Sequence, residues 1–324
     1  MAKKDGVSCE TKFKTTCGGQ ALIEGILMQG PEKRCVVVRK ADGELSVETE
    51  PVKKRTGWKA LPFIRGVFVF CGSMVNGVKA LMRSAELSDD GSQPAEEPTG
   101  LDKWISEHFS EEKANSLIVT IGAVLGVAFS IALFILLPTA LTGLIALAWK
   151  TMPLWFRAVL EGALKVVIFL LYLYLCSKLK EIHRVFQYHG AEHKTIYCYE
   201  NGLDLTVENV RIQPRHHPRC GTSFLFVVII VSIFLSIVIF TPLHIENTFL
   251  RMLLHLLLLP IICGVTYEFN RYVGAHDMPL CRALRAPGMW MQNFTTFEPD
   301  DSMIEVAITA LSQVLPEEQG ADRW

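Results

Sequence analysis

Residues 117–137 read LIVTIGAVLGVAFSIALFILL, and none of them carries a charge. A helix of about 20 apolar residues is long enough to cross the roughly 30 Å hydrocarbon core of a bilayer. We therefore predict a membrane-spanning helix at 117–137, with Pro138 interrupting the apolar run at that point. Residues 141–149 either extend this span or lie at the far interface.

Three more apolar runs follow, at residues 158–176, 224–240 and 252–267, and Pro260 inside the last is a position for a kink. Together the runs predict an α-helical integral membrane protein with about four transmembrane helices and a mixed α/β cytosolic portion. The sequence shows no internal repeat of the kind that marks transporters with duplicated halves.

The composition narrows the possible functions. The 324 residues include 32 basic and 33 acidic ones, for a formal net charge of -1, which argues against a nucleic-acid-binding protein. The nine cysteines are scattered and form no C-x-x-C pair, so we predict reduced thiols facing the cytosol or lipid. The first 14 residues have no apolar core and do not read as a secretory signal peptide.

The distribution of lysine and arginine predicts the orientation. The loop after the second predicted span carries seven basic residues, whereas the loop after the first offers only Lys150 and Arg157. The seven are Lys178, Lys180, Arg184, Lys194, Arg211, Arg215 and Arg219. The basic loop should therefore be cytosolic, and an even number of spans places both termini in the cytosol as well.

The polar segments divide the chain further. We predict a cytosolic β-hairpin unit at 1–56, an amphipathic interfacial helix at 57–83, an acidic linker at 84–102, an amphipathic helix and the first two spans at 103–177, a cytosolic loop at 178–222, the last two spans at 223–268, and a cytosolic strand and helix at 269–324. The helix at 61–82 either lies in the interface or re-enters the bilayer.

Local signals refine these segments. The dipeptide Asp42-Gly43 predicts a hairpin with a type I′ turn between strands at 35–39 and 45–48. The dipeptide Asn201-Gly202 predicts a second hairpin, between strands at 195–199 and 203–207. Residues 293–297 predict a strand. Residues 302–305 read as a capping box that opens a helix running to about Leu315.

The most informative motif is His189-Gly190-Ala191-Glu192-His193. On a helix the two histidines share one face, so both imidazoles can bind one divalent metal ion, most simply Zn²⁺. Glu192 would then lie beside the metal as a general base, as in the inverted zincin motif. Gly190 weakens the helix by about 1 kcal/mol relative to alanine.

Residues 216–221, HHPRCG, offer further ligands. His217 and Cys220 are three apart and can supply the third or fourth position of a zinc site. In the alternative interpretation the adjacent histidines, which lie between two arginines, bind the phosphates of lipid headgroups. The sequence leaves both interpretations open.

Several carboxylates have two interpretations each. Glu161 and Lys165 stand four apart inside the second span, where we interpret them as a structural ion pair, with a transport path as the alternative. Glu24, in a glycine-rich segment, is either a ligand or base or part of a tight turn. The acidic run at 298–301 either binds a metal or caps a helix.

Six separated motifs occur in a characteristic order. They are GGQALIEG at 18–25, PFIRG at 62–66, YHGAEHK at 188–194, HPRCGTS at 217–223, APG at 286–288 and EPDD at 298–301. In content and order they resemble the bacterial YqhQ family of multispanning membrane proteins, over about residues 17–315. The resemblance implies a protein of the bacterial cytoplasmic membrane. Because the family carries a provisional description as metal-dependent enzymes, it also implies a metal site, but no substrate.

Our leading hypothesis is a metal-dependent, hydrolase-like enzyme with its site at the cytosolic membrane surface. In it His189, His193, His217 and Cys220 bind a divalent metal, most simply zinc, and Glu192 is the base. The alternative is a non-catalytic membrane factor for the insertion, assembly or secretion of other proteins, and a transporter is the third option. The expected partners are the lipid bilayer and, under the alternative, other membrane proteins or a secretion or insertion machinery; no nucleic acid is expected.

Overall fold

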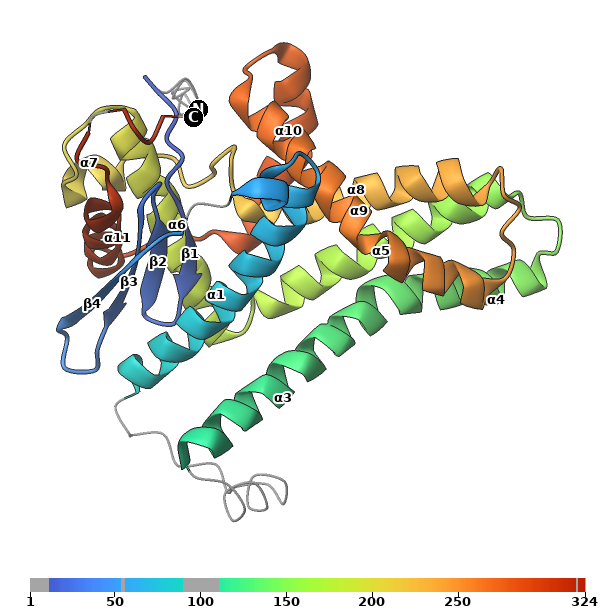
Figure 1. Ribbon diagram of the computed structural model, residues 1–324, viewed down its shortest axis with the longest axis horizontal. Helices are drawn as coiled ribbons and strands as arrows, with labels where there is room; N and C mark the ends of the chain where they lie inside the picture. The colour runs from blue at the N-terminus through green and yellow to red at the C-terminus, as the bar shows by residue number, and fades with distance from the viewer. Residues whose placement is uncertain (1–11, 54–55, 90–110, 319, 324) are drawn as a thin grey trace, which may run out of the picture. The chain divides into compact units, whose positions relative to one another are not determined.

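A computed structural model of the chain describes residues 12–53, 56–89, 111–318 and 320–323 (Figure 1). For residues 111–116, 118 and 119 it describes the backbone alone. The chain forms two compact units. The first comprises Met1–Asp89, Leu171–Val228 and Pro260–Trp324, and the second comprises Asp90–Leu170 and Ile229–Leu259.

A four-stranded antiparallel sheet is the centre of the first unit, and it confirms the predicted β unit. Its strands are β1 (Gly18–Leu22), β2 (Gly25–Gln29), β3 (Lys33–Arg39) and β4 (Leu45–Pro51), in the order β1-β2-β3-β4. The strands are consecutive in the chain because short turns, which fit antiparallel neighbours, join each to the next.

The hairpin predicted at Asp42-Gly43 is present, but its turn is not type I′. Arg39 pairs with Leu45, and the amide of Lys40 donates to the carbonyl of Glu44, so three residues form the loop. A type I′ turn needs positive φ at both central residues, whereas only Gly43 of this loop has one, at 86°.

Helices cover both faces of the sheet. On one face the apolar side chains of the strands pack against α6 (Lys180–Glu200) and α11 (Asp301–Val314). That core includes Ile26, Met28, Cys35, Val37, Tyr188, Ala191, Met303, Val306 and Leu311. On the other face Leu22 and Leu27 pack against Ala80 of α1 (Ile64–Ser88), which follows the short η1 (Gly57–Ala60). Three segments far apart in sequence therefore share one core.

The hairpin predicted at Asn201-Gly202 is wrong. Residues 195–199 continue α6, and Asn201 and Gly202 form the turn that ends it, with Gly202 at a φ of 62°. Ile196 is buried in the core formed with the sheet and α11, and Thr195 and Tyr197 are also buried, so tertiary burial outweighs their preference for strands. A short helix, α7 (Val207–Arg211), follows.

The strand predicted at 293–297 is also wrong, because α10 (Pro279–Thr295) runs through most of it. Gln292 and Thr295 are buried on the inner side of this helix. The final helix is confirmed as α11, but its N-cap is Asp300 rather than Ser302, since the Asp300 carboxylate accepts the amide of Met303 at 3.0 Å. Helix capping therefore explains part of the acidic run.

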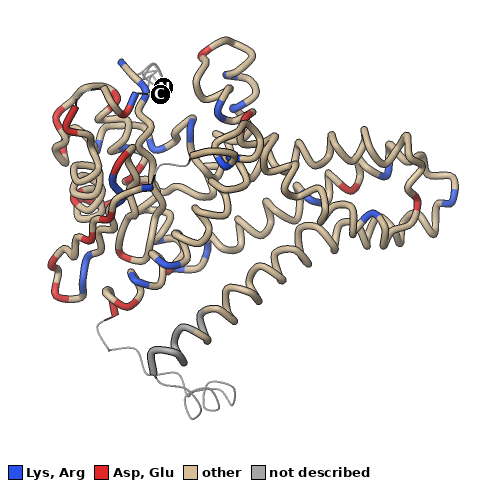
Figure 2. The backbone as a smooth tube through the Cα atoms, in the orientation of Figure 1, with Lys and Arg blue, Asp and Glu red and all other residues tan. Residues whose placement is uncertain are grey.

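Five helices among the described residues are long and apolar enough to cross a membrane. They are Ile64–Ser88, Thr120–Ala148, Leu154–Cys176, Gly221–Phe240 and Thr248–Ala275. The last three are α5, α8 and α9. Figure 2 shows that charged residues are sparse along these long helices and frequent around the sheet, α6 and α11. Four of the five match the predicted spans, and α1 is the addition.

Pro138 does not end the first predicted span. The chain continues as helix from α3 (Glu111–Ile131) through the single π-type turn η2 (Ala132–Leu136) into α4 (Leu137–Ala148). Proline has no amide hydrogen and its ring clashes with the carbonyl four residues earlier. The wider π-type turn directly before it absorbs that defect, so residues 141–148 extend the span and Trp149 follows its end.

Helix α1 buries small residues and leaves large apolar ones exposed. Gly66, Ala80 and Ser84 are its buried positions, whereas Val75 is 55% exposed. A Cβ on Gly66 would lie 2.6 Å from the side chain of Tyr267, so glycine permits close packing on α9. Residues 84–88 of the predicted linker belong to α1. The described residues do not include the rest of that linker from residue 90, nor residues 103–110 of the helix predicted after it.

The second unit contains a buried ionic cluster. The predicted pair Glu161–Lys165 is present at 3.1 Å, and Glu161 also contacts Arg251 at 3.0 Å, His255 at 2.5 Å and Thr139 at 2.8 Å. All five side chains are buried. A carboxylate within an apolar helix layer is thus fully satisfied, as the cost of desolvating it requires.

Candidate metal centre

The His189–His193 motif lies on α6, so the predicted helical spacing is confirmed. The two imidazole rings are 4.4 Å apart between centroids, and both are buried. The structure also explains the glycine in the motif. A Cβ on Gly190 would lie 2.0 Å from the carbonyl oxygen of Phe297, because the segment after α10 passes directly over this turn of α6.

Backbone carbonyls orient both imidazoles. Nδ1 of His189 lies 2.7 Å from the carbonyl oxygen of Thr295, and Nδ1 of His193 lies 2.6 Å from that of Arg215. A carbonyl only accepts, so each Nδ1 carries a hydrogen, and Nε2 is the nitrogen that can bind a metal once it carries no proton. Such an anchored second nitrogen is the usual arrangement around metal-binding histidines.

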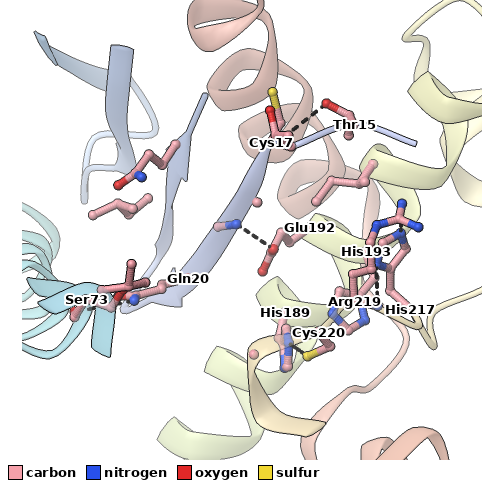
Figure 3. A pocket seen from close by; sticks show the side chains of 18 residues that line it. Thr15, Cys17, Gln20, Ser73, His189, Glu192, His193, His217, Arg219 and Cys220 are labelled. Carbon is pink, nitrogen blue, oxygen red and sulfur yellow. Dashed lines mark hydrogen bonds between the residues drawn. The ribbon is translucent and has the colours of Figure 1, made fainter. Parts of the chain in front are cut away.

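Cys220 completes a group of three ligand atoms. It precedes α8, and its Sγ lies 3.2 Å from Nε2 of His189 (Figure 3). The candidate ligand atoms of His189, His193 and Cys220 all lie within 4.8 Å of one another. Burial alone would raise the pKa of Cys220, but the two neighbouring imidazoles hold it well below 9.0. Burial would likewise lower the pKa of His189, whereas the Cys220 thiolate raises it to about 9. The cysteine is therefore a thiolate, which is the form that binds metals.

Glu192 stands beside this group with one oxygen engaged and one free. Its Oε1 accepts the amide hydrogen of Gly19 at 2.8 Å, and Figure 3 shows the carboxylate between β1 and the histidines. Its Oε2 is buried and has no hydrogen-bond partner among the described residues. Burial raises the pKa of Glu192, which favours a group that accepts a proton. A Cβ on Gly19 would lie 3.2 Å from the Glu192 carboxyl carbon, so glycine permits this approach.

His217, the fourth predicted ligand, does not join the three. Its Nε2 faces the carboxylate of Glu200 at 3.4 Å, and that carboxylate also pairs with Arg219. Burial lowers the pKa of His217 to about 4, so the ring is neutral. Gln292 holds the backbone of His217 through two hydrogen bonds of 2.8 Å. His217 therefore supports the loop that carries Cys220.

Sequence reasoning did not find Glu200 or Gln292. Glu200 follows His193 by seven residues, so it lies on the same face of α6, and that spacing is a usable signal. Gln292 lies in α10 and carries no such signal, because only tertiary packing brings it to His217.

The other candidate carboxylates lie elsewhere. Glu24 pairs with Arg184 and accepts the hydroxyl of Tyr188 at 3.1 Å. Glu298 pairs with the buried Lys194. Neither belongs to the group of three ligand atoms found among the described residues.

The three ligands fit a divalent ion of the zinc type. Two imidazole nitrogens and one thiolate are donors that zinc prefers, and three protein ligands leave one tetrahedral position open, as in catalytic zinc sites. Glu192, with its free Oε2, lines the same pocket as these ligands, and this pocket has a volume of about 330 Å³. The types of ligand atom, the orientation of the imidazoles and the number of protein ligands are therefore all consistent with a zinc-type site.

The low pKa of Cys220 has a measurable consequence. In metal-free protein we expect iodoacetamide to alkylate Cys220 at about pH 6 at least tenfold faster than an ordinary thiol, because the thiolate is already present there. Mass spectrometry of digested protein measures the rate, and added Zn²⁺ should protect the residue. Labelling that grows only above pH 8 would contradict the assignment; the Cys220→Ser variant identifies the labelled peptide.

Comparison with known proteins places these residues in context. Residues 61–317 match the family described as "Protein of unknown function (DUF1385)". The chain is 35% identical over 317 residues to the uncharacterized protein YqhQ of Bacillus subtilis (strain 168), and the alignment covers 94% of this chain and 93% of that protein. No solved structure matches the chain.

Proposed function

The chain belongs to the DUF1385 family, as its motifs predict, and we propose that it is a multi-pass membrane protein with a zinc-type hydrolytic site on its cytosolic part. One observation carries this proposal. His189, His193 and Cys220 converge with their ligand atoms within 4.8 Å, next to a buried carboxylate oxygen that has no partner among the described residues.

The chemistry follows from the positions of the side chains. A bound divalent cation would supply positive charge that polarises a substrate carbonyl and acidifies water. His189 and His193 hold their Nε2 atoms toward the centre, because their Nδ1 atoms are fixed on carbonyls. Oε2 of Glu192 accepts a proton from the attacking water and returns it to the leaving group. Its Oε1 continues to accept the hydrogen bond from the Gly19 amide.

The shared core of the first unit supports four membrane crossings. The sheet precedes α1, α6 follows α5, and α11 follows α9, yet all three pack together and must lie on one side of a bilayer. An even number of crossings must separate the sheet from α6. The helices α3–α4 and α5 supply two, so α1 remains on the side of the sheet, and α8 and α9 supply the other two.

Charge supports the cytosolic side for this core. The seven basic residues between α5 and α8 follow the positive-inside rule, and the loop between α8 and α9 is short. The exposed apolar residues of α1, such as Ile64 and Val75, then lie in the membrane interface, which suits a helix that packs its small residues on the protein. We assign the protein to the cytoplasmic membrane with both termini inside.

Metal analysis tests the proposal. We expect purified full-length protein in detergent to contain about one zinc per chain, measured by plasma mass spectrometry. The variants His189→Ala, His193→Ala and Cys220→Ala should each lose the metal, because two remaining ligands bind weakly. His217→Ala should retain it with affinity lowered by about 10- to 100-fold, as expected for a supporting residue.

The exposed His276 provides the control, since His276→Ala removes an imidazole far along the sequence from the site. A parent protein that takes up no stoichiometric metal, even after incubation with Zn²⁺, would refute the hydrolytic site. It would favour the non-catalytic alternative, in which the folded cytosolic part docks other membrane proteins.

A further inference from the structure

Strand β1 has a free edge beside the proposed metal ligands. In the sheet order β1-β2-β3-β4 it pairs only with β2 among the described strands. The amides of Gly19 and Ile23 point away from β2, since they donate to Glu192 and to the Ser84 hydroxyl. Alternation along a strand directs the N–H and C=O of Ala21 to the same side, where no described strand pairs with them.

An apolar groove runs along this edge. The cavity has a volume of about 1040 Å³, and its lining includes Gly19 and Ala21 of β1. Its walls come from helices that cover opposite faces of the sheet: Val69, Met74 and Val78 of α1, and Val185 and Phe186 of α6. His189, Glu192 and Cys220 line the same cavity. The free edge therefore leads directly to the candidate metal centre.

Two features of the groove select its occupant. The apolar walls favour apolar side chains or an acyl chain equally, but the backbone groups of Ala21 need hydrogen-bond partners when water is displaced. An extended polypeptide supplies an N–H and a C=O at the required spacing, whereas an acyl chain supplies neither. The edge therefore favours a peptide over a lipid.

We propose that the groove binds an extended apolar polypeptide segment as an added strand on β1, and that the bond hydrolysed at this site is a peptide bond. This inference rests on the proposed function. Pairing at Ala21 carries the peptide two residues further to Gly19, which is where Glu192 stands. The water oxygen bonds to the peptide carbonyl carbon and the C–N bond breaks. Glu192 passes the proton taken from water to the departing nitrogen, and the second proton of that water moves from the new carboxyl group to the amine, so the products are a carboxylate and an ammonium group.

Binding is tested with a matched pair of peptides. The probe is a capped peptide of about ten leucine, valine and alanine residues with a lysine at each end and a central diazirine analogue of leucine, long enough to extend along all of β1 while it pairs at Ala21. The experiment uses full-length Glu192→Gln protein, loaded with zinc and placed in nanodiscs, so that the peptide binds without being cleaved. We expect crosslinks on β1 and on the groove side of α1, located by mass spectrometry.

N-methylation distinguishes strand addition from simple apolar binding. A strand uses every second amide toward its neighbour, so methylating one alternate set should weaken binding about tenfold, while methylating the other set should not. Equal binding of both methylated peptides would overturn the inference. This comparison changes only the probe and does not depend on how a protein variant folds.

A protein variant gives the reciprocal test. Ala21→Pro removes the outward amide at an edge position where proline is tolerated, and Ala21→Ser keeps it. We expect Ala21→Pro to weaken peptide crosslinking about tenfold and Ala21→Ser to leave it unchanged, with zinc content equal in both. A diazirine-labelled phosphatidylglycerol that labels the groove and displaces the peptide would identify a lipid groove and overturn the inference.

The two proposals fail in different ways. Absence of zinc together with methylation-sensitive peptide binding would refute the hydrolytic site and also peptide-bond cleavage, while strand addition would stand. Zinc bound by His189, His193 and Cys220, with both methylated peptides bound equally, would refute strand addition alone.

Discussion

Glu192→Gln should lower the rate of hydrolysis by about 10²- to 10⁴-fold, the usual contribution of a general base, without releasing the metal. Glutamine preserves the shape of the side chain and its carbonyl oxygen can still accept the Gly19 amide, but it cannot take up a proton. The measurement is cleavage of the leucine-valine-alanine peptide by zinc-loaded full-length protein, followed by mass spectrometry, with metal content determined on the same samples.

Glu181→Gln is the matched control, because Glu181 is an exposed carboxylate in the first turn of the same helix. It should leave both rate and metal content unchanged. If Glu192→Gln cleaved the peptide as fast as the parent protein, Glu192 would not be the base, whatever the metal content.

Glu161→Ala should destabilise the second unit by about 3–5 kcal/mol. Glu161 is the carboxylate that compensates Lys165 and Arg251, and all three side chains are buried. Its removal leaves two buried cations without a counter-ion. Unfolding of detergent-solubilised protein, followed by circular dichroism during heating, measures the shift in midpoint.

The exposed Glu246 supplies the comparison, since it lies between α8 and α9 and makes none of the contacts of the cluster. Glu246→Ala should change stability by no more than about 0.5 kcal/mol. Retention of zinc by Glu161→Ala protein would show that the damage is confined to the second unit. An unchanged midpoint would mean that the cluster contributes nothing net to stability.

The helical periodicity of the site motif was predictable, but its ligand set was not. Spacing alone places His189 and His193 on one face of a helix, since four residues make about one turn. The choice between His217 and Cys220 depends on the conformation of the loop between α7 and α8, which Gln292 and Glu200 hold from other elements. A single sequence gives no measure of such distances.

The incorrect strands have a common cause. Residues 195–199 and 293–297 are rich in β-branched and aromatic side chains, and local preference favours a strand in both. In the structure both lie largely in helices whose inner faces are buried, so tertiary packing outweighs a local preference of less than about 1 kcal/mol per residue. The type I′ turn failed for a smaller reason, a loop one residue longer than the dipeptide suggested.

Chain chemistry alone was sufficient for properties that depend on neighbours in sequence. Long uncharged runs specify apolar helices because a helix satisfies its own backbone hydrogen bonds, and the His189–His193 spacing specifies a shared helix face. Tertiary structure decided what depends on residues distant in sequence: which sheet face α1 covers, how Gly19 reaches Glu192, and which cysteine and histidines converge. The Gly19–Glu192 hydrogen bond joins residues 173 apart in the chain, and only the packing of β1, α6 and the loop before α8 brings such atoms close together.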